Sequence, residues 1–237
     1  EALSLGDRLS YLEDPNGTYS AKELMTEAGL KRFTPNKTEV PSFGYTSSVY
    51  WFVVDFINAA ESPVERMLEI GYPVLDDIQL FVYLGDDSNP KHLIAGDKFP
   101  FSKREINHRN FIFPLVFQPN TPTTVLIRLK TESSMQLPLT IFNQAEINER
   151  DQDFLIGQGI FYGTMLVMVL YNLFLFLATR VRTYFYYVCV VFFGGLFQFG
   201  LHGFAFQYLW PNAIYWNQVS LAFCIGILVA MMSAFCS

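Results

Sequence analysis

The chain has 237 residues and a formal net charge of −6, and its charged residues are divided very unevenly along the sequence. Residues 1–153 contain all 22 acidic residues and 14 of the 16 basic ones, a net charge of −8, whereas residues 154–237 contain only Arg180 and Arg182. An acidic domain argues against nucleic acid as a partner. All three cysteines lie in 154–237, so residues 1–153 use neither disulfides nor thiolate chemistry.

The first 60 residues predict a short strand, a helix and a buried strand. Residues 11–15 read as a strand ended by proline, and residues 20–23 form a capping box that starts a helix expected to end at Gly29. Residues 31–42 are polar and predict a loop. Residues 45–57 are apolar on both faces of a period-two pattern, which predicts a central strand covered on both sides.

The sequence from residue 67 to residue 141 continues this alternation in short segments separated by turn signals. The expected strands are 67–70, 78–84, 92–95, 111–115, 124–130 and 137–141, with a turn at 85–90. Seven or so short strands and one helix predict an antiparallel sandwich.

The remaining residues predict helices. Residues 143–153 are polar and contain neither glycine nor proline, so we expect a helix that continues into the next segment as a stiff rod. Because about 20 apolar residues span a bilayer, spanning helices are expected at about 155–179, 183–206 and 215–237. The chain is therefore divided into a β-sandwich domain at 1–143, a helical junction at 144–153 and a membrane region at 154–237.

The positive charges predict the orientation in the bilayer. Arg180 and Arg182 lie in the short turn after the first spanning helix, and short loops bearing Lys or Arg stay cytoplasmic. Residues 1–153 are therefore expected on the outer side of the membrane. Residues 1–3 show no signal-peptide pattern, so we expect that, if the domain is exported, its leader has already been removed. Polar residues of the apolar helices are expected to face other helices; they are Gln158, Asn172, Gln198, His202 and Gln207.

Four segments of the chain resemble one family of proteins: residues 68–78, 96–115, 171–176 and 209–211. Together they resemble the bacterial seven-transmembrane receptors with diverse intracellular signalling modules, including their type-2 extracellular domain. The resemblance implies a periplasmic jelly-roll sandwich similar to carbohydrate-binding modules, on a protein of the bacterial inner membrane. It also implies seven membrane helices, of which this chain shows three, and a histidine kinase or diguanylate cyclase output domain beyond residue 237.

Tyrosines and aspartates form the first group of candidate binding residues. Tyr72, Asp76 and Asp77 follow one another at a strand end and suit a sugar site, a cation site or a carboxylate pair for acid–base work. The alternative is a turn in which the carboxylates accept backbone N–H groups or an arginine. Five aromatic residues are candidate platforms on which sugar rings stack: Tyr45, Tyr50, Trp51, Tyr72 and Tyr83. The alternative is that most of them lie in the core, as expected for Trp51, whereas Tyr72 and Tyr83 are expected to be exposed.

Arg104, His108 and Arg109 form the second candidate group. An arginine can hold the carboxylate of an acidic ligand, or pair internally with Asp76, Asp77 or Asp97 and pin loops together. Two histidines without a cysteine argue against zinc. A calcium hypothesis involves the aspartates 76, 77, 86, 87 and 97. We expect no metal and no cofactor.

These observations leave three functional hypotheses. The leading one is a sensor that binds a periplasmic ligand, such as a glycan or another small molecule, and signals through its membrane helices. The second is a protein-interaction or homodimerisation module of a membrane complex. The third, a membrane-anchored glycan hydrolase, rests on the carboxylates alone, and we expect no catalytic residue and no enzyme activity in these 237 residues.

Overall fold

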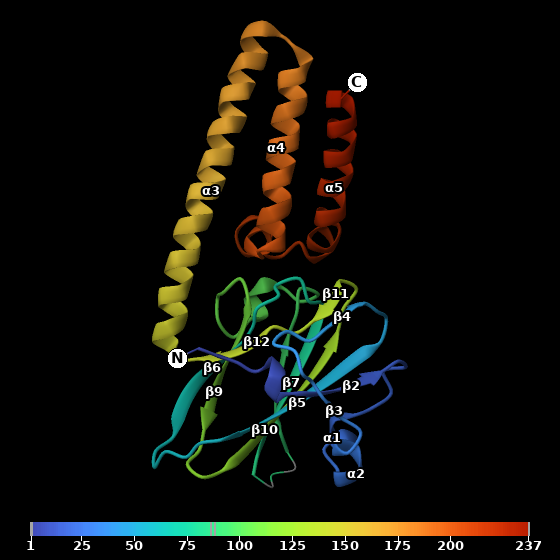
Figure 1. The fold of residues 1–237 in the computed structure, drawn as a ribbon, viewed down its shortest axis with the longest axis vertical. Coiled ribbons are helices and arrows are strands. Elements are labelled where there is room, and N and C mark those ends of the chain that lie inside the picture. Colours follow the sequence, from blue (N-terminus) through green and yellow to red (C-terminus); the bar gives the residue numbers. More distant parts are fainter. Residues whose placement is uncertain (1, 86, 88, 237) are drawn as a thin grey trace. The chain divides into compact units, whose positions relative to one another are not determined.

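The computed structural model describes residues 2–85, 87 and 89–236, and it divides into two compact units, Glu1–Glu146 and Ile147–Ser237 (Figure 1). The first unit is built from β-strands and the second from helices, as the sequence predicts. Each unit is described by itself.

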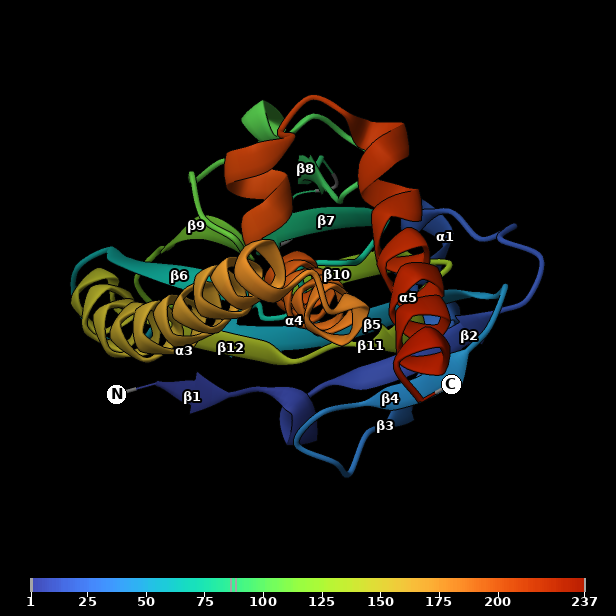
Figure 2. The same cartoon turned by 90° about the horizontal axis from the view of Figure 1, so that it is seen from above.

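The first unit contains three antiparallel sheets, two of which pack face to face. The larger sheet has the order β3-β2-β5-β10-β7-β8, the second β1-β12-β6-β9, and a small third sheet pairs β11 with β4. Figure 2 lets the order β8, β7, β10, β5, β2 be followed across the larger sheet. The strands of the larger sheet are β3 (Thr34–Pro35), β2 (Ser10–Asp14), β5 (Val49–Ile57), β10 (Pro122–Lys130), β7 (Asp77–Leu84) and β8 (Lys91–Ala95). The others are β1 (Leu3–Ser4), β12 (Leu139–Phe142), β6 (Val64–Ile70), β9 (Phe111–Phe117), β11 (Ser134–Gln136) and β4 (Ser42–Tyr45). The prediction of an antiparallel sandwich is confirmed.

Strand β5 shows why the sandwich has two apolar layers. Its residues Tyr50 and Phe52 face the core between the two large sheets, where they join Leu68 and Phe113 of the opposite sheet. Its residue Trp51 is 1% exposed and belongs to a second apolar cluster on the outer face of the larger sheet. Because successive side chains of a strand point to opposite faces, the apolar residues 49–54 are buried on both sides, as predicted, whereas Asp55 beyond them is exposed.

Two single-turn helices cover that outer cluster. Helix α1 (Ala21–Leu24) starts at the predicted capping box, in which Glu23 N–H donates to Ser20 Oγ and Ser20 N–H donates to Glu23 Oε2. Leu24 is 1% exposed and packs into the outer cluster. The prediction of one helix ending at Gly29 is wrong, because Thr26 adopts an extended backbone and caps a separate helix, α2 (Glu27–Leu30), in which Gly29 lies.

The second unit contains three long helices and one turn of π-helix. The helices are α3 (Gln144–Thr179), α4 (Arg182–Leu201) and α5 (Ile214–Cys236), and the π-turn η3 is Ala205–Leu209. Among the described residues, three helices are long and apolar enough to cross a bilayer. The second one is shorter than the predicted 183–206, because the chain leaves the helix at His202 and Gly203 adopts a φ of 79°.

One of the predicted polar contacts joins two helices. Tyr162 of α3 and His202, which caps α4, are hydrogen-bonded at 3.2 Å between the hydroxyl and Nδ1. The side-chain amide of Asn172 instead donates to Met168 O of its own helix. The polar residues of the membrane region therefore bond both between and within helices.

Candidate functional site

The sequence-predicted candidates gather at one end of the sandwich. In the larger sheet Asp77 pairs with Lys130, and Ile78 pairs with Ala95, so the start of β7 lies beside the ends of β8 and β10. Three loops therefore meet at this end, comprising residues 71–76, 96–110 and 131–133. We call them the loop cluster.

Asp76 is the centre of the loop cluster and is 6% exposed. One of its carboxylate oxygens accepts hydrogen bonds from Thr131 Oγ1 at 2.8 Å and from the backbone N–H of Glu132. Its other oxygen lies 3.6 Å from the ammonium of Lys98. A carboxylate with this many donors stabilises the loops that supply them. This matches the alternative interpretation of the sequence, in which the aspartates accept backbone N–H groups in a turn.

Backbone contacts hold the second loop against the first. Asp97 N–H donates to Leu75 O at 2.8 Å, and Lys98 N–H donates to Asp76 O at 3.3 Å. Gly96 makes this approach possible, because its φ is 138° and a Cβ atom there would overlap Asp76 O. Only glycine fits a position with both constraints.

Asp97 is a second buried carboxyl beside Asp76, and it is 6% exposed. Burial and, to a smaller extent, the negative charge of Asp76 raise the pKa of Asp97 to about 7, although Arg104 and Lys98 act in the opposite direction. Two carboxyl groups so close in a desolvated site do not both ionise easily. The loop cluster therefore contains a group that takes up a proton near neutral pH.

Arg104 is packed beside this pair. Its ring contacts are with Phe101 and Phe111, with the guanidinium carbon 4.4 and 4.2 Å from the two ring centroids. Its Nη1 donates to the backbone oxygens of His108 at 2.9 Å and Arg109 at 2.6 Å. Burial lowers the pKa of Arg104 and Asp97 raises it, and the guanidinium stays charged at neutral pH. Arg104 thus stabilises the conformation of residues 104–111 through its contacts with their backbone oxygens and with Phe111.

Three other candidates, Asp77, Tyr72 and Tyr83, have different surroundings. Asp77 pairs with Arg128 at 2.9 Å on the sheet, which is a partner that the sequence did not indicate. Tyr72 is half-buried against the core. The prediction that Tyr83 is exposed is wrong: it is 7% exposed, because its side chain turns into the outer cluster beside Trp51.

His108 and Arg109 are half-buried in the loop cluster, and His108 Nδ1 accepts from Asn110 N–H at 3.1 Å. Among the described residues no group of three or more His, Cys, Asp or Glu side chains is arranged to hold a metal ion. Asp86, part of the calcium hypothesis, lies outside the described residues.

An open groove that the sequence did not indicate borders the loop cluster. It has a volume of about 540 Å³ and is lined by Tyr45, Thr46, Ser47, Lys98, Lys130, Thr131 and Glu132. Lys98 links it to the buried carboxyls, because its ammonium lies 2.9 Å from Glu132 and 3.6 Å from Asp76. The groove is a polar cavity of the sandwich with the size of a small-ligand site.

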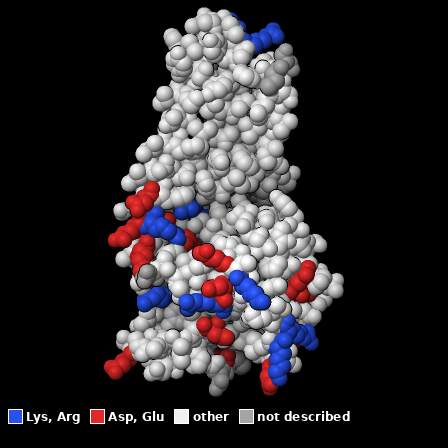
Figure 3. Space-filling view, in the orientation of Figure 1, with Lys and Arg blue, Asp and Glu red and all other residues white. Residues whose placement is uncertain are grey.

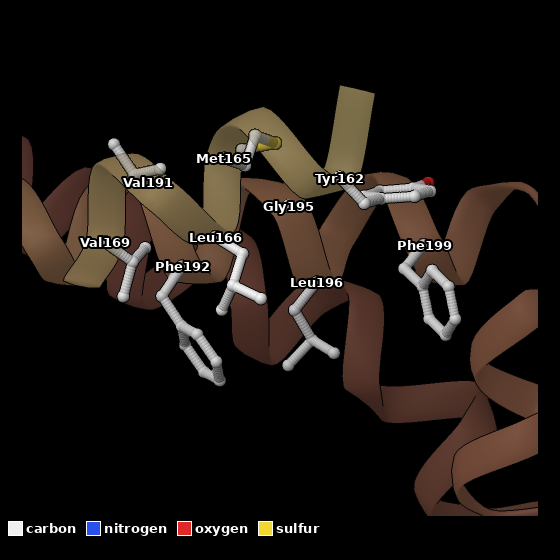
Figure 4. A pocket seen from close by; sticks show the side chains of 9 residues that line it. All are labelled: Tyr162, Met165, Leu166, Val169, Val191, Phe192, Gly195, Leu196 and Phe199. Atoms are coloured by element: carbon white, nitrogen blue, oxygen red, sulfur yellow. The ribbon is translucent and has the colours of Figure 1, made fainter. Parts of the chain in front are cut away.

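The helices contain an apolar pocket of a different kind. It has a volume of about 200 Å³ and lies between α3 and α4, where the hydroxyl of Tyr162 is the polar group drawn among its lining side chains (Figure 4). Gly195 and Met165 both line it, and Met165 Cε would lie 3.2 Å from a Cβ added to Gly195. A pocket lined almost wholly by hydrocarbon in a spanning helix pair is typical of helix packing in lipid.

The distribution of charge supports a bilayer around the helices. Figure 3 shows acidic and basic side chains over the β-rich unit and at the start of α3, whereas the rest of the visible helical face is uncharged except for basic atoms at one tip. The only charged residues after Asp153 are Arg180 and Arg182, and Arg180, with φ 57°, ends α3. This band matches the requirement that spanning helices carry no charge toward lipid.

Comparison with known families agrees with both units. Residues 6–143 match the family model described as 7TMR-DISM extracellular 2, and residues 155–237 match the model described as 7TM diverse intracellular signalling. The chain belongs to the seven-transmembrane receptors with diverse intracellular signalling modules. The resemblance carried by the four sequence segments is thereby confirmed, and the receptor consists here of an extracellular β-domain followed by membrane-embedded helices.

Two further comparisons add little to this receptor assignment. The search of curated proteins gives no match. Among solved structures, a family GH115 4-O-methyl-alpha-glucuronidase, BtGH115A, with specificity for decorated arabinogalactans, is 12% identical, with a TM-score of 0.27. The match covers 44% of this chain and 14% of that one, and so low a TM-score carries no argument about fold or function.

Proposed function

We propose that this receptor is the sensing part of a signalling protein in the bacterial inner membrane, with residues 1–153 in the periplasm. A soluble ligand binds the sandwich at the loop-cluster end, and the membrane helices carry the signal to a cytoplasmic kinase or diguanylate cyclase output. The chain itself performs no chemistry in this proposal. Ligand binding shifts the receptor only to the extent that the two signalling states differ in ligand affinity.

One observation carries the proposal: α3 joins the sandwich to the bilayer without interruption. It contains 36 residues, which at 1.5 Å per residue is on the order of 54 Å, whereas the hydrocarbon core of a bilayer is about 30 Å thick. The polar stretch 144–153, which has no glycine or proline, accounts for about 15 Å of the surplus.

The start of α3 is fixed to the last strand. Phe142, which ends β12, is 2% exposed and sits in the protein interior. The next residue, Asn143, donates its backbone N–H to Glu146 Oε2 at 3.0 Å and its side-chain amide to Oε1 at 3.3 Å. A strand, a bonded corner and a helix in direct succession transmit displacement better than a flexible linker does.

A labelling experiment tests the orientation on which the proposal depends. In a variant without native cysteines, Lys91→Cys reports on the sandwich and Val181→Cys reports on the turn between α3 and α4; both parent residues are exposed. A membrane-impermeant maleimide added to intact spheroplasts is expected to label position 91 at once and position 181 only after permeabilisation. The reverse pattern would contradict a periplasmic sensor.

A further inference from the structure

We infer that the groove beside the loop cluster binds a saccharide that carries a carboxylate, with Tyr45 as the stacking platform and Lys130 as the anion partner. The inference rests on the proposed function, because it names the ligand class of the sensing domain. Three features of the groove support it.

The first feature is the exposed ring of Tyr45. In a regular strand Tyr45 would lie on the same side as Phe43, two residues earlier. Phe43 packs against the core, with its ring stacked 4.3 Å from that of Tyr50, yet Tyr45 is 84% exposed.

The local backbone explains this reversal. Gly44 has a φ of 69°, which breaks the alternation, and the pairing of β4 with β11 shifts register between Met135 and Gln136. Bulges of this kind re-aim side chains and are frequent beside binding sites. A large ring turned out of the core exposes its negatively polarised face, which suits the C–H face of a pyranose.

The second feature is an uncommitted cation. The ammonium of Lys98 is held by Glu132 and Asp76. The side chain of Lys130, at the end of β10, forms no hydrogen bond or ion pair in the part of the chain that the structure describes. The charge of Lys130 still acts on the groove. The pKa of Glu132 is lowered by the hydrogen bond and the charge of Lys98 and, in addition, by the charge of Lys130. An exposed ammonium beside an aromatic platform suits an anionic substituent on the stacked ligand.

The third feature is the presence of hydroxyl groups and space. Ser47 is exposed and makes no hydrogen bond with the described residues, so its hydroxyl is available to a sugar hydroxyl. The volume of about 540 Å³ lies within the range of small-molecule sites. Ring, cation and hydroxyl together favour a uronate over a neutral sugar or a simple carboxylate.

The test measures binding of three probes to the full chain in nanodiscs, by saturation-transfer NMR and calorimetry. The probes are methyl glucuronide, methyl glucoside, which has the ring without the charge, and acetate, which has the charge without the ring. We expect the glucuronide to bind most tightly, and its affinity to fall as salt is added, because the ammonium is exposed.

Variants assign the binding to the two residues. Tyr45→Ala and Lys130→Gln are each expected to weaken the glucuronide about tenfold or more, and Lys130→Gln is expected to reduce it to the level of the glucoside. Two variants are the matched controls. Tyr45→Phe keeps the ring, and Lys91→Gln removes an exposed lysine from the far end of β8. Both mutated side chains are exposed, so the fold is retained.

Three results would overturn the inference: no binding of any probe, equal binding of glucoside and glucuronide, or glucuronide binding that neither variant weakens. None of these bears on the orientation measured by maleimide labelling. Failure of this ligand assignment is therefore distinguishable from failure of the receptor proposal.

Discussion

Replacing Asp97 by asparagine is expected to remove most of the pH dependence of the stability of the sandwich between pH 5 and 7.5. The carboxyl has a pKa of about 7 when folded and an ordinary value of 3.8. The folded protein therefore holds a proton that the unfolded chain has released, and the free energy of unfolding falls as the pH rises from about 4 to 7, then stays level. Asparagine resembles the protonated form at every pH.

The size of the effect follows from the pKa difference. The full range between the two values corresponds to roughly 4 kcal/mol, and the part between pH 5 and 7.5 to about 2–3 kcal/mol. For a unit of this size, this is a decrease in melting temperature on the order of 10 °C. Arg104 attracts only the ionised form of Asp97, and this attraction is already contained in the pKa of about 7, so its loss in Asp97→Asn adds no further change to the expected slope.

Urea unfolding of the chain in nanodiscs at a series of pH values measures this slope. Wild type is expected to lose stability toward pH 7.5, and Asp97→Asn to remain nearly level. Glu65→Gln removes an exposed carboxylate from β6 and is the control, expected to follow wild type. Equal slopes for wild type and Asp97→Asn would refute the assignment of a buried, proton-binding carboxyl at position 97.

Three further predictions concern stability, each measured by urea unfolding. Gly96→Ala is expected to lower the free energy of unfolding by roughly 3 kcal/mol or more, because the added Cβ would collide with Asp76 O. Gly44→Ala is the control: Gly44 has a φ of 69° but open space around it, so the loss should be only about 1–2 kcal/mol. Equal losses for the two variants would contradict the close approach of the loops at Gly96. Phe113→Ala, 2% exposed, is expected to cost about 3–5 kcal/mol, whereas Val116→Ala on the exposed face of the same strand should cost little; a large loss at position 116 would contradict the assigned faces of β9. Arg128→Gln breaks a partly exposed ion pair with Asp77 and is expected to cost at most about 1 kcal/mol, less in high salt; a loss that salt leaves unchanged would show that Asp77 has another role.

Features encoded locally were predictable from the sequence. Residues 49–54 of β5 include no charged residue, so their burial on both faces follows from the sequence of the strand itself. The spanning helices follow from the absence of charge over long runs. The helix start at Ser20 follows from two residues that cap one another, but its early end does not, because the second cap at Thr26 depends on how the chain turns over the sheet.

Features created by tertiary contact were not predictable. Asp76 and Thr131 are 55 positions apart in sequence, and only the register of β7 with β10 brings them together. The same register gives Asp77 the partner Arg128, where composition alone offered several arginines. Tyr45 is one of five aromatic residues that the sequence offers as candidate platforms, and the glycine before it is the single sequence signal that its side chain turns outward.

The most direct test of the receptor account is the backbone hydrogen exchange of residues 144–156 in nanodiscs. If α3 couples the sandwich to the bilayer as one rod, its amides are expected to exchange slowly and evenly across the polar stretch into the apolar one. A fast-exchanging segment between residues 148 and 153 would mean a flexible linker, and transmission through α3 would then be contradicted.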